Sequence, residues 1–99
     1  MLESAYQACL SYELNAAGIE HQTQLTVPIQ YGGAKIDAGF RIDLLVANCV
    51  IVELKAVEEV HPVHHAQLLT YLKLMNLRLG FLINFNVQSL RDGIKRLVR

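Results

Sequence analysis

Charged side chains interrupt an apolar stretch of the sequence, FRIDLLVANCVIVELKA. Three of them, Asp43, Glu53 and Lys55, are of types that carry out chemistry in proteins. The stretch has the alternation of two strands joined by a tight connection, and side chains two residues apart in a strand share a face. Glu53 and Lys55 therefore point to one side, and Asp43 points away from Ile42 and Leu44. If the two polar faces coincide, two carboxylates and an ammonium group converge.

Such a convergence predicts a site for a divalent cation. Two carboxylates held within a few ångströms repel each other, and burial worsens the repulsion, so a cation normally neutralises them. Oxygen ligands that leave positions for water suit Mg²⁺ or Mn²⁺ rather than zinc. Lys55 beside the ion could orient or help deprotonate a water molecule, or stabilise a negatively charged transition state. The alternative is that Lys55 is an ordinary cross-strand partner of Glu53 or Asp43 on a solvated sheet face.

Hydrophobic periodicity predicts the elements that must position these residues. We expect a helix over residues 2–18, strands over 24–30, 35–46 and 49–57, a helix over 62–76, and strands over 79–85 and 94–98. Pro28 suggests an edge position for the first strand, and the second and third strands should pair antiparallel. The apolar run at 79–85 is typical of the sheet centre beneath helices. The last segment could instead end a helix that begins at Ser89.

Composition limits the function classes. The chain of 99 residues has room for one domain, and its apolar residues, 53% of the total, form no run of about 18 that could cross a membrane. We expect no membrane partner, and because the acidic Glu3 does not resemble the start of a signal peptide, the expected compartment is the cytoplasm. The isolated Cys9 and Cys49 are predicted to be buried free thiols. With so small a core, a homodimer would help to cover apolar surface.

The two signs of charge are segregated along a chain of zero formal net charge. Residues 1–59 carry eight acidic side chains against three basic ones, whereas residues 60–99 carry six basic side chains against Asp92 alone. The basic residues of the second part are Lys73, Arg78, Arg91, Lys95, Arg96 and Arg99. They are candidates for phosphate contact, and the alternative is that they only solvate exposed faces.

The segments also resemble a known family when they are taken together. Asp43, then nine residues, then ELK with Glu53 and Lys55, in the order helix, three strands, helix, strand, resembles the PD-(D/E)XK nuclease superfamily. More closely, LESAYQACLSYEL, VPIQYGGAKIDAGFRIDLLV, VIVELKAVEEVHPVHHAQLLTYLKL and LRLGFLINFNV are similar to the small GxxExxY proteins. The resemblance covers nearly the whole chain, with the segments in order and at compatible spacing.

This resemblance implies a fold and a set of roles. The fold would be α/β (α+β), a small restriction-endonuclease-like core with a mixed central sheet flanked by helices. Asp43 and Glu53 would be the metal carboxylates, Lys55 the catalytic lysine, Glu3 the acidic residue of the first helix and Gln67 the site residue of the second. The residues alone leave Glu3 equally explained as a favourable charge in a first helical turn, and Gln67 as part of a solvated helix face.

The implied activity is Mg²⁺- or Mn²⁺-dependent hydrolysis of phosphodiester bonds in DNA or RNA. The alternative is a non-catalytic module that keeps the fold and its acidic pocket to bind nucleic acid or a protein, because fold does not determine function.

The chain departs from the family pattern at two places. The glycine that opens the family motif would fall just before Met1, and relatives carry a further upstream helix, so we expect the domain, residues 1–99, to lack that N-terminal helix. His65 stands where relatives often have an acidic residue, next to His64. Adjacent helical residues point in different directions, so we expect these histidines to lie at the surface or the site edge rather than to share a metal.

Overall fold

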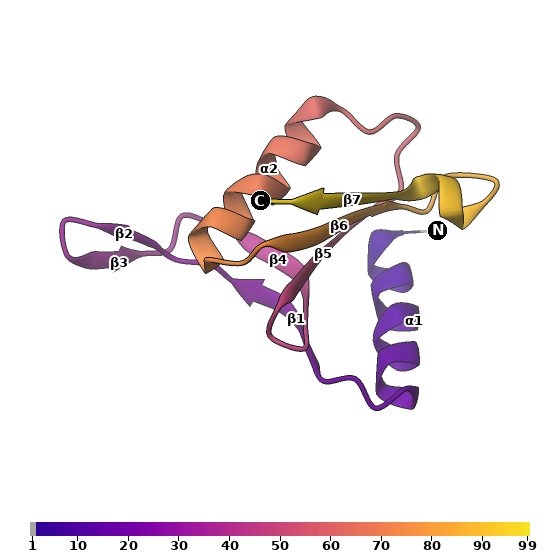
Figure 1. The fold of residues 1–99 in the computed structure, drawn as a ribbon, viewed down its shortest axis with the longest axis horizontal. Coiled ribbons are helices and arrows are strands. Elements are labelled where there is room, and N and C mark those ends of the chain that lie inside the picture. Colours follow the sequence, from indigo (N-terminus) through magenta and orange to yellow (C-terminus); the bar gives the residue numbers. More distant parts are fainter. Residues whose placement is uncertain (1) are drawn as a thin grey trace.

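The computed structural model describes residues 2–99, which form two α-helices, seven strands and one short 3₁₀ turn (Figure 1). In chain order these are α1 (Glu3–Ala16), β1 (His21–Thr26), β2 (Ile29–Tyr31), β3 (Ala34–Ile36), β4 (Arg41–Val46), β5 (Val50–Lys55), α2 (Pro62–Met75), β6 (Leu79–Asn84), η1 (Leu90–Gly93) and β7 (Ile94–Val98). Neither helix is long and apolar enough to cross a membrane within this described part of the chain.

The main sheet has five strands in the order β1-β4-β5-β6-β7. β4 and β5 pair antiparallel, as predicted, and β5 pairs parallel with β6 through the crossover that contains α2. The other pairs, β1 with β4 and β6 with β7, are antiparallel, so the sheet is mixed. β1 lies at one edge, as Pro28 suggested, and β6 is an inner strand. The last segment is the strand β7, preceded by η1.

The two helices cover opposite faces of this sheet. On one side, Leu68, Tyr71 and Leu72 of α2 pack into a cluster with Ile42 and Ile51 of the sheet. On the other side, the α1 side chains Leu10 and Leu14 pack on a second cluster that contains Leu44, Val52 and Leu54. α1 has no buried residue of its own, whereas α2 has three. The α2 side is therefore the deeper core, and α1 is a lighter cover whose first turn stays accessible.

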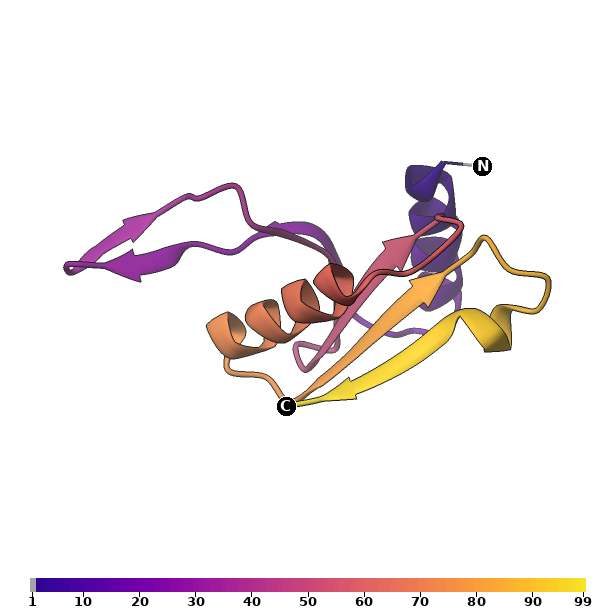
Figure 2. The same ribbon diagram turned by 90° about the horizontal axis from the view of Figure 1, so that it is seen from above.

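The expected long strands over residues 24–30 and 35–46 are each broken in two. Their outer parts form a separate hairpin, β2 and β3, whose register pairs Ile29 with Ile36 and Tyr31 with Ala34. Figure 2 shows this hairpin as an arm that projects away from the helices and the main sheet. Pro28 offers no backbone N–H to a ladder, and Gly39 has a φ of 79°, so both connections leave the strand conformation.

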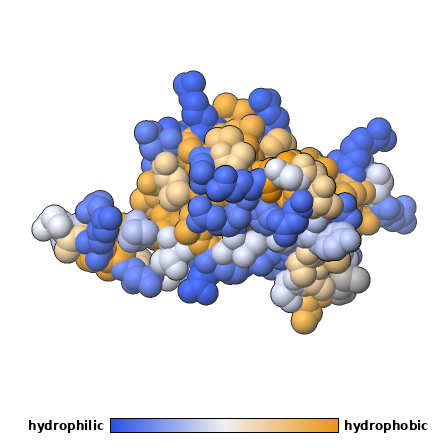
Figure 3. All heavy atoms as spheres, turned by 90° about the horizontal axis from the view of Figure 1, so that it is seen from below, coloured by the Kyte–Doolittle hydropathy of each residue, from blue (hydrophilic) through white to orange (hydrophobic). Residues whose placement is uncertain are grey.

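The arm brings apolar side chains to the surface. Paired residues of a hairpin share a face, so Ile29, Tyr31, Ala34 and Ile36 lie on one side of the arm. Tyr31 is 74% exposed and Ile36 40% exposed. Figure 3 shows the arm as the protrusion at the left of the view, with hydrophobic surface beside hydrophilic surface.

The prediction for the two cysteines was wrong in part. Cys9 and Cys49 are free thiols, but both are exposed. Cys9 lies on a helix with no buried residue, and Cys49 follows Ala47 and Asn48, whose φ angles of 52° and 57° form the tight turn between β4 and β5. Both positions are therefore set by local geometry rather than by the apolar character of the thiol.

Candidate active site

The main sheet forks at the residues singled out above. The pairing between β4 and β5 runs from Val46↔Val50 to Leu44↔Val52 and stops there. Beyond that level, β4 stays paired with β1 through Ile42 and Arg41, while β5 stays paired with β6 through Glu53, Leu54 and Lys55. We call this divergence the fork, formed by residues 41–43 of β4 and 53–55 of β5. It leaves backbone groups of both strands without ladder partners.

The two carboxylates hold the fork together. The backbone N–H of Asp43 donates to Oε1 of Glu53 at 3.0 Å, and the backbone N–H of Leu54 donates to Oδ2 of Asp43 at 2.8 Å. Each side chain therefore accepts the hydrogen bond that a backbone carbonyl would accept in a continuous ladder. An apolar side chain at either position would leave a backbone N–H without its partner.

The strand alternation predicted around Asp43 was wrong. The sequence pattern placed Ile42 and Leu44 on the same face, yet Ile42 packs in the α2 cluster and Leu44 in the α1 cluster, and Leu45 returns to the α2 cluster. β4 therefore changes phase at Asp43. The two polar residues still converge, but they do so because the strands fork and not because two flat polar faces coincide.

Glu53 is the more buried of the two carboxyl groups, with 5% of its surface exposed. Its pKa is raised from 4.5 to about 8, mainly by burial, with smaller contributions from the negative charge of Asp43 and a hydrogen bond to that side chain. The hydrogen bond from the Asp43 backbone and the positive charge of Lys55 act in the opposite direction. At neutral pH the pair therefore holds a proton in place of a second negative charge.

Lys55, Glu3 and His64 meet at the open end of β5. Oε1 of Glu3 accepts a hydrogen bond from the backbone N–H of Ala56 at 3.4 Å, one residue beyond Lys55. Burial and the positive charge of Lys55 lower the pKa of His64, whereas the negative charge of Glu3 raises it. The first turns of both helices thus reach the end of β5, and His64 lies at the edge of the site.

Gln67 is exposed on α2, one turn before the buried Tyr71, and does not line the cleft at the carboxylates. Tyr71 is 3% exposed, and burial raises the pKa of its hydroxyl, with the charges of Glu53 and Asp43 acting in the same direction. Hydrogen bonds from the Arg41 backbone and the Gln67 side chain oppose that rise. Tyr71 is a core residue whose hydroxyl responds to the charges of both carboxyl groups, a link that its helical spacing in the sequence does not indicate.

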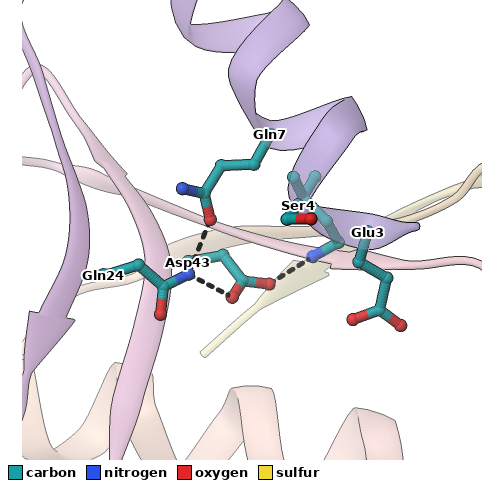
Figure 4. A pocket seen from close by; sticks show the side chains of 6 residues that line it. Glu3, Ser4, Gln7, Gln24 and Asp43 are labelled. Atoms are coloured by element: carbon teal, nitrogen blue, oxygen red, sulfur yellow. Dashed lines mark hydrogen bonds between the residues drawn. The ribbon is translucent and has the colours of Figure 1, made fainter.

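An open cleft of about 430 Å³ lies between the first turns of α1 and the fork. It is lined by Glu3, Ser4, Gln7, Gln24, Asp43 and Leu54. Figure 4 shows Gln7 reaching from α1 and Gln24 from β1 toward Asp43, with the carboxylate of Glu3 pointing away from it. Glu3 is therefore brought to the cleft but not to the carboxylate pair.

The donor set suits a hard cation with few protein ligands. Among residues 2–99, no group of three or more histidine, cysteine, aspartate or glutamate side chains could hold a metal ion. A closed zinc site needs four such ligands and does not fit. Asp43 and Glu53 offer two carboxylates, which is the number that Mg²⁺ commonly takes from a protein while water and substrate phosphates complete its shell.

The basic residues of the second half are spread around the molecule. All six are exposed, but Lys73 in the last turn of α2 and Arg78 before β6 lie at the end of these elements remote from the fork. Arg99 lies at the same end and donates to the Leu77 carbonyl (2.8 Å) and to Oδ1 of Asn76 (3.0 Å). These three charges are therefore not part of the site.

The fold and the fork together define a nuclease-like core, and the comparison with protein families agrees. The family model of the PD-(D/E)XK nuclease superfamily matches residues 1–97, so the chain belongs to this superfamily. Its two helices and mixed five-stranded sheet are consistent with a restriction-endonuclease-like core. Comparison with curated proteins gives no match, and neither does comparison with solved structures.

Proposed function

We propose that this protein is a divalent-metal-dependent nuclease that hydrolyses phosphodiester bonds of DNA or RNA. The observation that carries the proposal is the pair of carboxyl groups at the fork, the buried Glu53 and the half-buried Asp43, in a chain of the PD-(D/E)XK superfamily. Lys55 follows them at the open end of β5. Nucleases of this superfamily generally use divalent metals.

In this proposal the carboxylates of Asp43 and Glu53 hold Mg²⁺ or Mn²⁺. A bound cation would replace the proton of the pair, polarise the phosphodiester and balance the charge that develops on it. Lys55 places a mobile positive charge beside the pair, where it can hold a phosphate oxygen or stabilise the transition state.

Two further residues act around that pair. Gln67 would hold the hydroxyl of the buried Tyr71, whose pKa responds to the charges of Glu53 and Asp43. Glu3 holds the chain where it leaves β5, through the N–H of Ala56, so its role is to position Lys55.

The test has a binding arm and a cleavage arm. Mg²⁺ or Mn²⁺ should raise the melting temperature of the wild type, because a ligand that binds only the folded state stabilises it by about 2.7 kcal/mol at a hundred times its Kd. Asp43→Asn should weaken that shift. Single- and double-stranded DNA and RNA are then incubated with each protein, with Mg²⁺, Mn²⁺ or EDTA. Asp43→Asn, purified by the same procedure, controls for a contaminating nuclease, which would cut equally in the wild-type and variant samples.

The outcomes separate the candidate functions. Metal-dependent cleavage by the wild type but not by Asp43→Asn supports the nuclease. A wild type that binds metal but cuts none of these nucleic acids would support the non-catalytic module. A melting curve that metal leaves unchanged, with no binding heat in calorimetry, contradicts the metal site itself.

Other expectations from the sequence remain part of the proposal. They are membership of the GxxExxY group, a single nuclease-like domain over residues 1–99, a cytoplasmic location and a homodimer. Measuring the molar mass in solution tests the homodimer directly.

A further inference from the structure

Gln24 has an unusual backbone for a residue inside a strand. Its φ is 51°, in the left-handed region that residues other than glycine, asparagine and aspartate rarely occupy. Three other non-glycine residues within 2–99 have positive φ, namely Ala47, Asn48 and Asn76, and they lie in the turn before β5 and at the end of α2. Those positions need the conformation to turn the chain. Gln24 lies in the middle of β1, where no turn requires it.

The distortion faces the point where β4 changes phase. β1 pairs Thr23 with Leu44 and Leu25 with Ile42, so Gln24 is the residue opposite Asp43. Both strands of the β1–β4 pair are thus irregular at the same point, Gln24 in β1 and Asp43 in β4. A backbone held in a sparsely populated region persists only where its surroundings enforce it, and such residues cluster at functional sites.

The left-handed backbone of Gln24 directs its side-chain amide toward Asp43 and Gln7. Nε2 of Gln24 donates to Oδ1 of Asp43 at 3.2 Å and to Oε1 of Gln7 at 2.6 Å (Figure 4). An amide nitrogen has two hydrogens and both are used, so the opposite orientation would set the amide oxygen of Gln24 against a carboxylate. Asp43 therefore has a donor on each oxygen, because Leu54 N–H already holds Oδ2.

We propose that Gln24 is a positioning residue that fixes the Asp43 carboxylate for its cation, with Gln7 orienting the Gln24 amide. This inference rests on the proposed metal site and deepens it. A neutral amide restrains the carboxylate without cancelling its charge, whereas lysine or arginine at this position would compete with the cation.

Gln24→Gly and Gln24→Asn test the role. Glycine adopts the left-handed region freely and asparagine tolerates it, so both variants should fold, but neither reproduces the glutamine amide against Asp43. Gln22→Gly is the matched control, because Gln22 lies in the same strand but away from Asp43. Its side chain donates only one long hydrogen bond, 3.5 Å, to Asn48 in the turn between β4 and β5. The three variants and the wild type are titrated with Mn²⁺ in a calorimeter.

We expect both Gln24 variants to raise the Kd for Mn²⁺ about tenfold, the size of the effect found when outer-shell partners of metal ligands are removed. Gln22→Gly should leave the Kd unchanged. In the cleavage assay the Mn²⁺ concentration for half-maximal rate should rise by the same factor, with kcat at saturating Mn²⁺ retained. A purely structural role would lower the melting temperature and leave the Kd unchanged.

A readout without metal completes the test. In the ¹⁵N spectrum of the metal-free protein, the side-chain amide signals of Gln24 should move on Asp43→Ala. Wild-type Mn²⁺ affinity in both Gln24 variants would overturn the inference while leaving the proposed function intact. If the wild type binds no Mn²⁺, the result contradicts both the proposed metal site and the role inferred for Gln24.

Discussion

Glu53→Gln should change how the stability of the metal-free protein depends on pH. The pKa of Glu53 is raised from 4.5 to about 8 in the folded state, chiefly by burial. A group with a raised folded-state pKa binds its proton more tightly when folded. Its contribution to stability is therefore complete below about pH 4.5 and is lost as the pH rises toward 8. Glutamine imitates the protonated acid and cannot lose that proton.

The magnitude follows from linkage. Each unit of pKa difference is worth about 1.4 kcal/mol, so a shift from 4.5 to about 8 makes the wild type lose roughly 4 kcal/mol between pH 5 and pH 9 through this group alone. That is a large share of the 5–15 kcal/mol typical of a small domain. Glu53→Gln keeps an acceptor for the Asp43 N–H and should escape the loss.

The assay is urea unfolding at pH 5 and pH 9 in the presence of EDTA. The quantity of interest is the stability difference between Glu53→Gln and wild type at each pH, because other titrating groups cancel in it. Glu58→Gln, at an exposed position, is the control and should show no such pH-dependent difference. Parallel changes for wild type and Glu53→Gln, within about 1 kcal/mol, would refute a buried carboxyl with a raised pKa.

Three further variants test other parts of the structure. Lys55→Ala should lower metal-dependent cleavage by about 100-fold or more in a gel assay, with the circular dichroism spectrum unchanged, because the lysine acts on the reaction and not on folding. Gly93→Ala should destabilise by roughly 3 kcal/mol in urea unfolding, since the new Cβ would lie 2.0 Å from the backbone oxygen of Asn84; a loss below 1 kcal/mol would contradict this close approach. Arg99→Ala should cost about 1 kcal/mol in thermal unfolding through its lost bonds to Asn76 and the Leu77 carbonyl, and an unchanged melting temperature would show that these contacts are not made in solution.

Much of the sheet could be predicted because its strands have strong local signals. The β-branched run at Val50–Val52 and the apolar run at residues 79–85 predicted β5 and β6 correctly. The alternation over residues 24–30 predicted a strand there, but β1 begins earlier, at His21, and ends at Thr26. Pro62 correctly marks the start of α2, and the turn signal before Ile94 marks the start of β7. The breaks that create the arm were also visible in Pro28 and Gly39, but the alternation of apolar residues through both positions concealed them.

The convergence of Asp43 and Glu53 was predicted, but the geometry that brings them together was not. Ile42, Leu44 and Leu45 are all apolar, so a change of phase at Asp43 leaves no trace in the hydrophobic pattern. The left-handed backbone of Gln24 has no sequence signal, because glutamine is not a residue chosen for that conformation. Tyr71 is buried, so its position in the helical pattern predicts only a core residue. These features arise from contacts between elements, which the alternation along one strand does not record.

The β2–β3 arm has a consequence for local opening. A two-stranded hairpin is marginally stable by itself, and this arm is joined to the body next to one backbone hydrogen bond, from Val27 N–H to the Phe40 carbonyl at 2.9 Å. Its amides should therefore exchange with solvent through openings that cost far less than global unfolding, while those of β5 and β6 exchange only when the whole sheet opens. A protease cut at the Gly32–Gly33 turn would accordingly leave the fork assembled, with both pieces held by the sheet.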